Sequence, residues 1–281
     1  MTSCILSLKK IDYPNFEVVL VDNASKDGSP ARLKEKFPDL VVIVNDRNLG
    51  YAEGNNVGIR YFLKKPVGHV LLLNNDTEVE PEFLSELVRA SEKDPGAGIL
   101  GSKIYYFDRP DRIWYAGGYL HRVTGKTYHR GLGKRDKGQY DGIAEVDFVS
   151  GCAMLIKREV LEALKGFDPD YFYSFEDVDL SLRARALGYR LLYVPSSRIR
   201  HKFARGSGGR FSPLYIYYRV RNGILFMKKN NFNWFRRSYS FVVNPLKMIA
   251  FALLTGNFKG ARAALLGWLD YIKGRYGEAR Q

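Results

Sequence analysis

Short apolar runs alternate with helix-like stretches over the first hundred residues of the chain. Three runs rich in valine and leucine, each bounded by polar turns, lie at residues 16–22, 40–44 and 69–76. Stretches with apolar residues at helical spacing lie at residues 30–37, 52–64 and 81–93. Apolar runs of this length predict buried strands, and strands that alternate with helices predict parallel pairing. The pattern therefore predicts an α/β fold with a doubly wound sheet, in which ligands bind at the carboxyl ends of strands.

The pattern changes after residue 100. Residues 101–140 are rich in glycine and aromatic residues, which predicts hairpins and mobile loops. Apolar order returns at residues 146–156, and the residues Ser174, Phe175, Glu176 and Asp177 are expected to open a helix with Ser174 as its N-cap. Residues beyond Pro213 have helical spacing, with aromatic side chains interleaved with cations.

Composition narrows the class of protein. Of 281 residues, 46% are apolar and 26% are charged, which is typical of a globular chain and excludes a disordered one. Two cysteines are too few for a disulfide scaffold or a cysteine-rich zinc site, which favours a reducing compartment. Residues 1–14 lack the pattern of a secretory signal, and no uninterrupted run of about 18 apolar residues predicts a membrane span. A cytoplasmic location is therefore expected.

The excess of basic residues is concentrated in the last third of the chain. The net charge is +14, yet residues 198–281 hold 17 lysine and arginine residues against two acidic ones. We therefore expect one domain at residues 1–212 and a helical, basic region at residues 213–281. Aromatic side chains interleaved with cations fit an anionic membrane surface, a nucleic acid or an ordinary solvated face. The apolar segment 248–254 and Trp268 favour the membrane over nucleic acid, so peripheral attachment to the cytoplasmic face of a membrane is expected.

Two acidic clusters carry candidate chemistry. Asn74, Asn75 and Asp76 end an apolar run, where a carboxylate has the position and hardness to hold Mg²⁺ or Mn²⁺. An Asx turn between strand and helix explains the same residues about equally well. Glu176 and Asp177 supply a candidate general base. On the local pattern alone, stabilisation of a helix N-terminus by carboxylates is the more economical explanation.

Three further segments suggest contacts to a phosphorylated ligand. His201 follows a basic strand and is a candidate metal or phosphate contact. The loop 206–209, between Arg205 and Arg210, has the glycines to wrap a diphosphate or to serve as a flexible linker. Residues 48–58 read NLGYAEGNNVG, which is neither a Walker A loop nor a dinucleotide-binding fingerprint.

The order of these patterns resembles that of family 2 glycosyltransferases, and most of all the rhamnosyltransferase-like branch that builds polysaccharides. Six motifs over roughly residues 3–230 carry the resemblance: YPNFEVVLVDNASKDGS, NLGYAEGNNVGI, LLLNNDTEVEP, VSGCAMLIKREV, FYSFEDVDLSLRARALGYRLLYVP and HKF. The resemblance implies the GT-A fold, a mixed α/β sheet flanked by helices that binds a nucleotide-diphospho-sugar. It also implies a metal-dependent transfer of a sugar to a saccharide or lipid-linked acceptor.

The resemblance also assigns roles to individual residues. Asp177, with Glu176, would be catalytic, and a single base opposite the leaving group implies inversion. Asp76 and His201 would bind Mg²⁺ or Mn²⁺, and Asn74 stands where many members have aspartate. Residues in the nucleotide-sugar site would be Asp22, Asn23, Asn48, Gly50, Asn55, Asn74, Asn75, Asp76 and Gly151.

One departure from the family pattern concerns the start of the chain. Family members begin with a strand inside the sheet, and this sequence opens instead with a helical segment at residues 2–10. The resemblance implies that the edges beside that strand are unpaired and apolar. We favour the explanation that the start of this sequence is set too late over the explanation that the protein is a degraded remnant of the family. The alternative function is therefore a non-catalytic, membrane-associated scaffold, and a homo-oligomer remains open.

Overall fold

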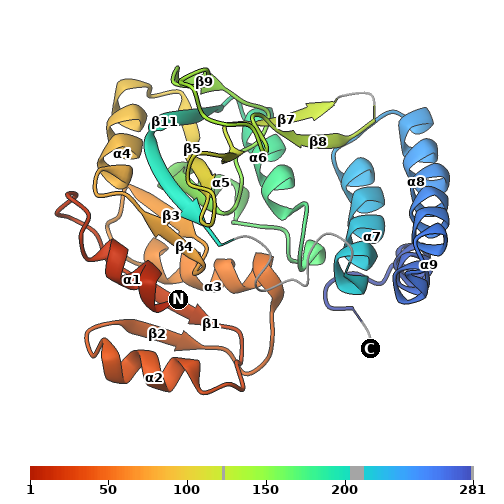
Figure 1. Cartoon of the computed structure of the whole chain (residues 1–281), viewed down its shortest axis with the longest axis horizontal. Coiled ribbons are helices and arrows are strands. Elements are labelled where there is room, and N and C mark those ends of the chain that lie inside the picture. The colour runs from red at the N-terminus through yellow and green to blue at the C-terminus, as the bar shows by residue number, and fades with distance from the viewer. Residues whose placement is uncertain (122–123, 203–211, 280–281) are drawn as a thin grey trace.

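A computed structural model describes residues 1–121, 124–202 and 212–279. The N-terminal segment forms a small parallel sheet covered by helices, at the lower left of Figure 1. Its elements are α1 (Thr2–Leu8), β1 (Val19–Asp22), α2 (Ser29–Lys36), β2 (Val41–Val44) and α3 (Gly50–Leu63). The expected parallel pairing of the first two apolar runs is confirmed, with Val19 opposite Val41.

The third apolar run belongs to a different, seven-stranded sheet. The main path of this sheet is β3 (His69–Leu73), β10 (Ala153–Lys157), β5 (Ala97–Tyr106), β11 (Arg190–His201) and β4 (Thr77–Val79). The short strands β6 (Ile113–Tyr115) and β9 (Ala144–Glu145) pair with β5 and β11 respectively. β5 and β11 run parallel, whereas β10 is antiparallel to both of its neighbours. The sheet is therefore mixed, as the resemblance implies.

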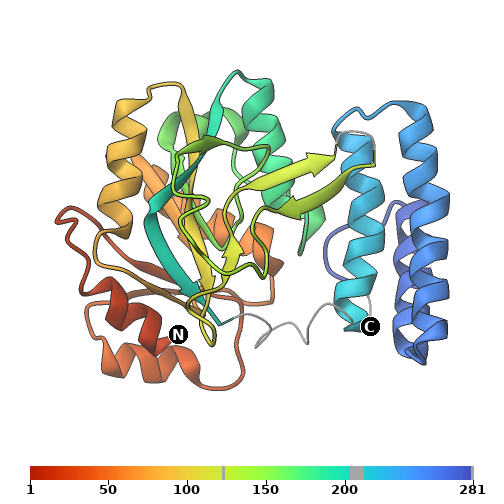
Figure 2. The same ribbon diagram turned by 45° about the horizontal axis from the view of Figure 1, so that its top comes forward.

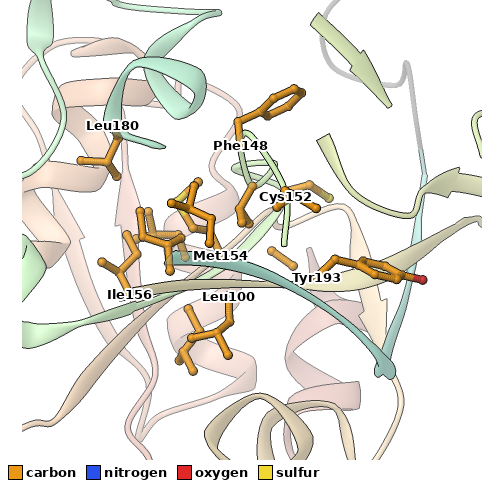
Figure 3. Packing of buried hydrophobic residues seen from close by; sticks show 14 of the residues in the cluster. Leu100, Phe148, Cys152, Met154, Ile156, Leu180 and Tyr193 are labelled. Carbon is orange, nitrogen blue, oxygen red and sulfur yellow. The ribbon is translucent and has the colours of Figure 1, made fainter. Parts of the chain in front are cut away.

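Helices and a hairpin surround this sheet (Figure 2). They are α4 (Phe83–Lys93), α5 (Arg158–Leu164), the 3₁₀ turn Pro169–Tyr171, α6 (Glu176–Ala186) and the hairpin of β7 (Gly118–His121) with β8 (Lys126–His129). α4 buries Phe83, Leu84, Leu87 and Val88, whose spacing places them on one face of the helix. Figure 3 shows the core, in which Met154 and Ile156 of the sheet lie on the side of Leu180 of α6, whereas Leu100 lies on the opposite face of the sheet.

A cavity separates the two sheets. Its volume is about 610 Å³, and its lining includes Val19 and Leu20 of β1 together with Val70 and Leu71 of β3. Over the ranges described above, β1 pairs with β2 alone and β3 pairs with β10 alone. The two strand edges that face this cavity are therefore unpaired and apolar.

The C-terminal region is a bundle of three helices, α7 (Pro213–Lys229), α8 (Trp234–Leu254) and α9 (Phe258–Ile272), at the right of Figure 1. α9 packs closely on α7, because a Cβ atom at Gly267 would lie 2.5 Å from the carbonyl oxygen of Tyr217. α7 also contacts the main core through Leu225, Phe226 and Met227. Among the helices that the structure describes, none combines the length and apolarity needed to cross a bilayer.

Candidate active site

The loop that precedes α6 has an uncommon backbone conformation. Phe172, Ser174 and Phe175 have φ angles of 55°, 71° and 76°, a region that residues other than glycine rarely adopt. The prediction that Ser174 caps the helix is wrong, because Phe175 is the N-cap residue and no side chain caps the helix. Left-handed backbone at Ser174 and Phe175 instead turns the chain inward, and strain of this kind concentrates at functional sites.

This loop presents two carboxyl groups to the interior. Glu176 is 7% exposed, and its Oε2 atom has no hydrogen-bond partner in the described part of the chain. Burial, followed by the negative charge of Asp177, raises the pKa of Glu176 well above its ordinary value. Burial also raises the pKa of Asp177, against the opposing effect of hydrogen bonds from the backbone of Gly151 and Val178. The pKa values of both carboxyl groups are therefore raised, and that of Glu176 is raised well above its ordinary value.

Three loops distant in the sequence converge on Asp177. Gly151 donates its N–H to Asp177 Oδ2 at 3.0 Å, and the hydroxyl of Tyr51 donates to the carbonyl oxygen of Gly151 at 2.6 Å. The N–H of Tyr51 in turn donates to the carbonyl oxygen of Phe172 at 2.6 Å. The beginning of α3, the segment before β10 and the loop before α6 are thus joined by hydrogen bonds around the expected base.

The two expected metal ligands lie together. β4 and β11 place Thr77 opposite His201, which brings His201 Nε2 to 3.1 Å from Asp76 Oδ1. Asp76 is partly exposed and His201 is buried. No group of three or more metal-binding side chains occurs in the described ranges. A carboxylate oxygen and an imidazole nitrogen are both ligands that a divalent cation of the Mn²⁺ type accepts.

Asp76 and Asp177 lie in one neighbourhood. Asn74 donates its N–H to the carbonyl oxygen of Cys152 at 3.0 Å, beside the Gly151 that contacts Asp177. Asp76 and Asp177 both raise the pKa of the buried Cys152 thiol, after the larger effect of burial itself. The structure therefore brings these two acidic clusters to the same end of β3 and β10.

A second cavity of about 380 Å³ lies next to these groups and extends between β1 and β3. Six of the nine residues expected to contact a nucleotide-sugar are among its lining residues: Asn23, Gly50, Asn55, Asn74, Asn75 and Asp76.

Hydrogen bonds within the protein already occupy several of these polar groups. Asn23 donates to the carbonyl oxygen of Gly50 at 2.8 Å, and Asn48 accepts the N–H of Gly50 at 2.9 Å. Asp22 is buried and accepts the N–H of Ser25 at 2.9 Å. These contacts shape the loop at the ends of β1 and β2.

Asn55 is turned toward its own helix, where its amide donates to the carbonyl oxygen of Tyr51 at 2.8 Å. The expected glycine-rich contact at residues 206–209, with Arg205 and Arg210, lies outside the described residues.

Sequence reasoning missed two polar residues in α7. Arg221 and Asn222 are fully buried, although they belong to a segment expected to face a membrane or solvent. Both donate hydrogen bonds to carbonyl oxygens of the loop before α6. The indication in the sequence was the position of Arg221, four and three residues after the buried Tyr217 and Tyr218, which places it on the apolar face of the helix.

Comparisons with known proteins add a family and a fold. The model of the family "Glycosyl transferase family 2" matches residues 1–165. An N-acetylglucosaminyl-diphospho-decaprenol L-rhamnosyltransferase of Mycobacterium tuberculosis is 27% identical over 237 residues, which are 78% of this chain and 76% of that protein. The dTDP-rhamnosyl transferase RfbF of Shigella flexneri is also 27% identical over 237 residues, covering 80% and 75% of the two chains.

The structural comparison includes a mannosyltransferase of Pyrobaculum calidifontis in complex with GDP-Man and Mn²⁺. It superposes with a TM-score of 0.58 at 19% identity, over 96% of this chain and 82% of that one. Staphylococcus aureus TarS 1–349 in complex with UDP superposes with a TM-score of 0.56 at 16% identity, over 100% and 89% of the two chains. At these identities the superpositions show a shared GT-A fold.

Proposed function

The chain belongs to glycosyl transferase family 2, and from that premise we propose that it moves a sugar from a nucleotide-diphospho-sugar to a hydroxyl group of a saccharide or lipid-linked acceptor. The observation that carries the proposal is a chain of contacts from Asp177 to the cavity: Gly151 donates its N–H to Asp177 and accepts the hydroxyl of Tyr51, which lines the cavity together with Asn23 and Asp76. Two similar proteins named as rhamnosyltransferases support L-rhamnose as the sugar and dTDP as its carrier.

In the proposed reaction, Asp177 accepts the proton of the acceptor hydroxyl while that oxygen attacks the anomeric carbon of the sugar. The bond from this carbon to the diphosphate breaks as the new glycosidic bond forms, so the configuration inverts. Burial supports this role, because a carboxylate with a raised pKa is a stronger base near neutral pH. Burial and the neighbouring charge of Asp177 raise the pKa of Glu176 well above its ordinary value, which disfavours a second negative charge on the pair.

Asp76 and His201 would hold a divalent cation, whose chemistry is to offset the charge of the departing nucleoside diphosphate. Two solved structures of this fold are complexes with Mn²⁺, which supports Mn²⁺ or Mg²⁺ here. We further propose that residues 1–212 hold the donor site and that residues 213–281 serve the acceptor side.

The test combines binding with turnover. We expect dTDP-rhamnose to bind saturably to the full chain in the presence of Mn²⁺, with UDP- and GDP-sugars as competitors that rank the nucleotide. Asp177→Asn keeps the hydrogen-bond geometry at Gly151 but removes the base, so turnover should fall 10²–10⁴-fold with donor affinity within about threefold. Turnover that is unchanged in Asp177→Asn would refute the role of Asp177. Donor binding without turnover for any acceptor would instead favour a non-catalytic member.

A further inference from the structure

Exposed apolar side chains concentrate on two C-terminal helices. Of nineteen large apolar side chains that are exposed in the described ranges, twelve lie between Trp234 and Ile272. α8 and α9 stand at the outer edge of the molecule, with α7 between them and the sheet (Figures 1 and 2). Contiguous apolar surface of this kind marks an interaction site on a soluble domain.

On α9 the exposed residues form one stripe. Phe258, Leu265, Leu269 and Ile272 are separated by seven, four and three positions, which places them on one face of the helix, and they are 71%, 44%, 36% and 55% exposed. The opposite face is made of small buried residues, such as Ala264, that pack against α7. This face is therefore not required for the packing of the bundle.

α8 carries a second stripe of the same kind. Phe235, Val242, Leu246 and Leu253 are separated by seven, four and seven positions and are exposed. Trp268, which the sequence analysis assigned to the membrane, packs instead against Phe241 inside the bundle.

The charge of these helices selects among possible partners. Lys247, Lys259, Arg262 and Lys273 are exposed beside the stripes. The single acidic residue of α8 and α9, Asp270, accepts a hydrogen bond from Tyr217 of α7 and so faces the bundle. A surface that is apolar and cationic fits anionic lipid. A second copy of the same face would meet its own positive charge, which disfavours a symmetric dimer.

We propose that the outward faces of α8 and α9 dock this protein, parallel to the surface, on an anionic bilayer. The inference deepens the proposed function, because a lipid-linked acceptor presents its saccharide at such a surface. α7, on which both helices pack, also holds the loop that carries Glu176. Docking through α8 and α9 therefore sets the height of the transferase site above the lipid.

The test uses the full chain and vesicles of phosphatidylcholine with or without 30% phosphatidylglycerol. We expect co-sedimentation only with the anionic vesicles, weakened by 0.5 M salt. Leu265→Gln combined with Leu269→Gln should bind these vesicles at least tenfold more weakly. The matched control is Ile143→Gln combined with Leu187→Gln, two apolar residues outside this region that are more exposed than Leu265 and Leu269; this variant should bind normally.

Three results would each overturn docking on this face. They are equal binding by both double variants, no binding by the wild type, and a dimer in sedimentation velocity that the double substitution Leu265→Gln with Leu269→Gln dissociates. Binding of the nucleotide-sugar is measured on the same samples. Loss of vesicle binding with donor binding intact refutes the docking face alone, whereas absent donor binding with vesicle binding intact refutes the proposed transferase function alone.

A second inference rests on buried hydrogen bonds. The side-chain amide of Asn222 donates to the carbonyl oxygens of Tyr171, Tyr173 and Ser174 at 2.6, 2.8 and 3.0 Å. Arg221 donates to the carbonyl oxygen of Asp170 at 3.1 Å and to Asn222 Oδ1 at 2.9 Å. These contacts give hydrogen-bond donors to the backbone carbonyl groups of the strained loop immediately before Glu176.

The end of the chain joins the same network. Arg221 donates to the carbonyl oxygen of Gly277 at 2.7 Å, and the N–H of Gly277 donates to the carbonyl oxygen of Asp170 at 3.0 Å. We infer that Arg221 and Asn222 are positioning residues, which act on the reaction by holding the loop that places Asp177. This inference rests on the proposed role of Asp177.

Asn222→Ala should lower kcat at least tenfold, leave the affinity for the nucleotide-sugar unchanged, and move the acidic limb of the pH–rate profile to lower pH as the loop opens to water. Asn230→Ala is the matched control, because Asn230 of α7 donates to Asp179 of α6 and not to the loop. It should keep the kcat and pH profile of the wild type. Arg221→Lys provides a milder second variant, should Asn222→Ala fail to fold.

A merely structural role predicts loss of stability with an unchanged pH profile, and that result would overturn the inference. Equal loss of kcat in Asn222→Ala and Asn230→Ala would overturn it as well. Donor binding in each variant, measured separately, shows that the proposed donor site is intact.

Discussion

Gly50→Ala is the substitution for which the structure gives the sharpest expectation. Gly50 begins α3 with φ at +75°, and a Cβ atom there would lie 2.5 Å from the carbonyl oxygen of Phe172 and 2.6 Å from its ring. The same carbonyl oxygen accepts the N–H of Tyr51. A methyl group at this position therefore pushes apart the beginning of α3 and the loop that leads to Asp177.

The magnitude follows from two costs. A left-handed conformation costs a residue with a Cβ atom about 1–2 kcal/mol relative to glycine, and overpacking against backbone costs about 1–3 kcal/mol more. The free energy of unfolding should therefore fall by roughly 2–5 kcal/mol. For a chain of this length, about 1 kcal/mol corresponds to roughly 2 °C in Tm, so Tm should fall by roughly 4–10 °C. Because Gly50 also lines the cavity beside Asp76, nucleotide-sugar binding should weaken.

Thermal unfolding measures the loss of stability, with Gly58→Ala as control, and calorimetric titration of the Gly50→Ala variant with a nucleotide-sugar measures the loss of affinity. Gly58 lies in the interior of the same helix without a positive φ, and its nearest neighbour would be a flexible methyl group of Val21 at 3.3 Å. Since alanine favours the helix by about 1 kcal/mol over glycine, this control should remain within about 1 kcal/mol of the wild type. Equal effects of Gly50→Ala and Gly58→Ala would refute the reasoning.

The remaining predictions concern charge. Burial raises the pKa of Glu176, so its contribution to stability is most favourable below the ordinary value of about 4.3 and is lost as the pH rises through the folded-state pKa. Glu176→Gln should therefore raise Tm at pH 7.5 and flatten the dependence of Tm on pH; a lower Tm at pH 7.5 would contradict this. Asp76→Ala should abolish the increase in donor affinity on adding Mn²⁺, measured by titration with and without EDTA, and a retained increase would contradict the metal assignment. Lys103 is fully buried between Asp136 and Asp141, so Lys103→Met should destabilise the fold by about 3–5 kcal/mol in urea unfolding; a loss below about 1 kcal/mol would contradict it.

The sequence by itself determined the fold class and the elements that carry the chemistry. The alternation of strands and helices could be predicted because the buried side chains of each strand or helix recur at a fixed spacing along the local sequence. Asp76 was found for the same reason, since a polar residue that ends an apolar run must lie at a strand end. The order of six motifs then determined the family, which neither composition nor any one motif could do.

Only the tertiary structure decided which of these residues meet. The contacts that surround Asp177 join Tyr51 to Gly151 across 100 positions and Gly151 to Asp177 across 26, and no local period encodes such distances. Ser174 has the residue type of a helix cap, yet the turn that buries Glu176 removes it from that role. Arg221, one cation among many in the sequence, is buried because α7 packs across the loop. Desolvation and hydrogen-bond partners depend on what covers a residue, and that is settled only when distant segments pack together.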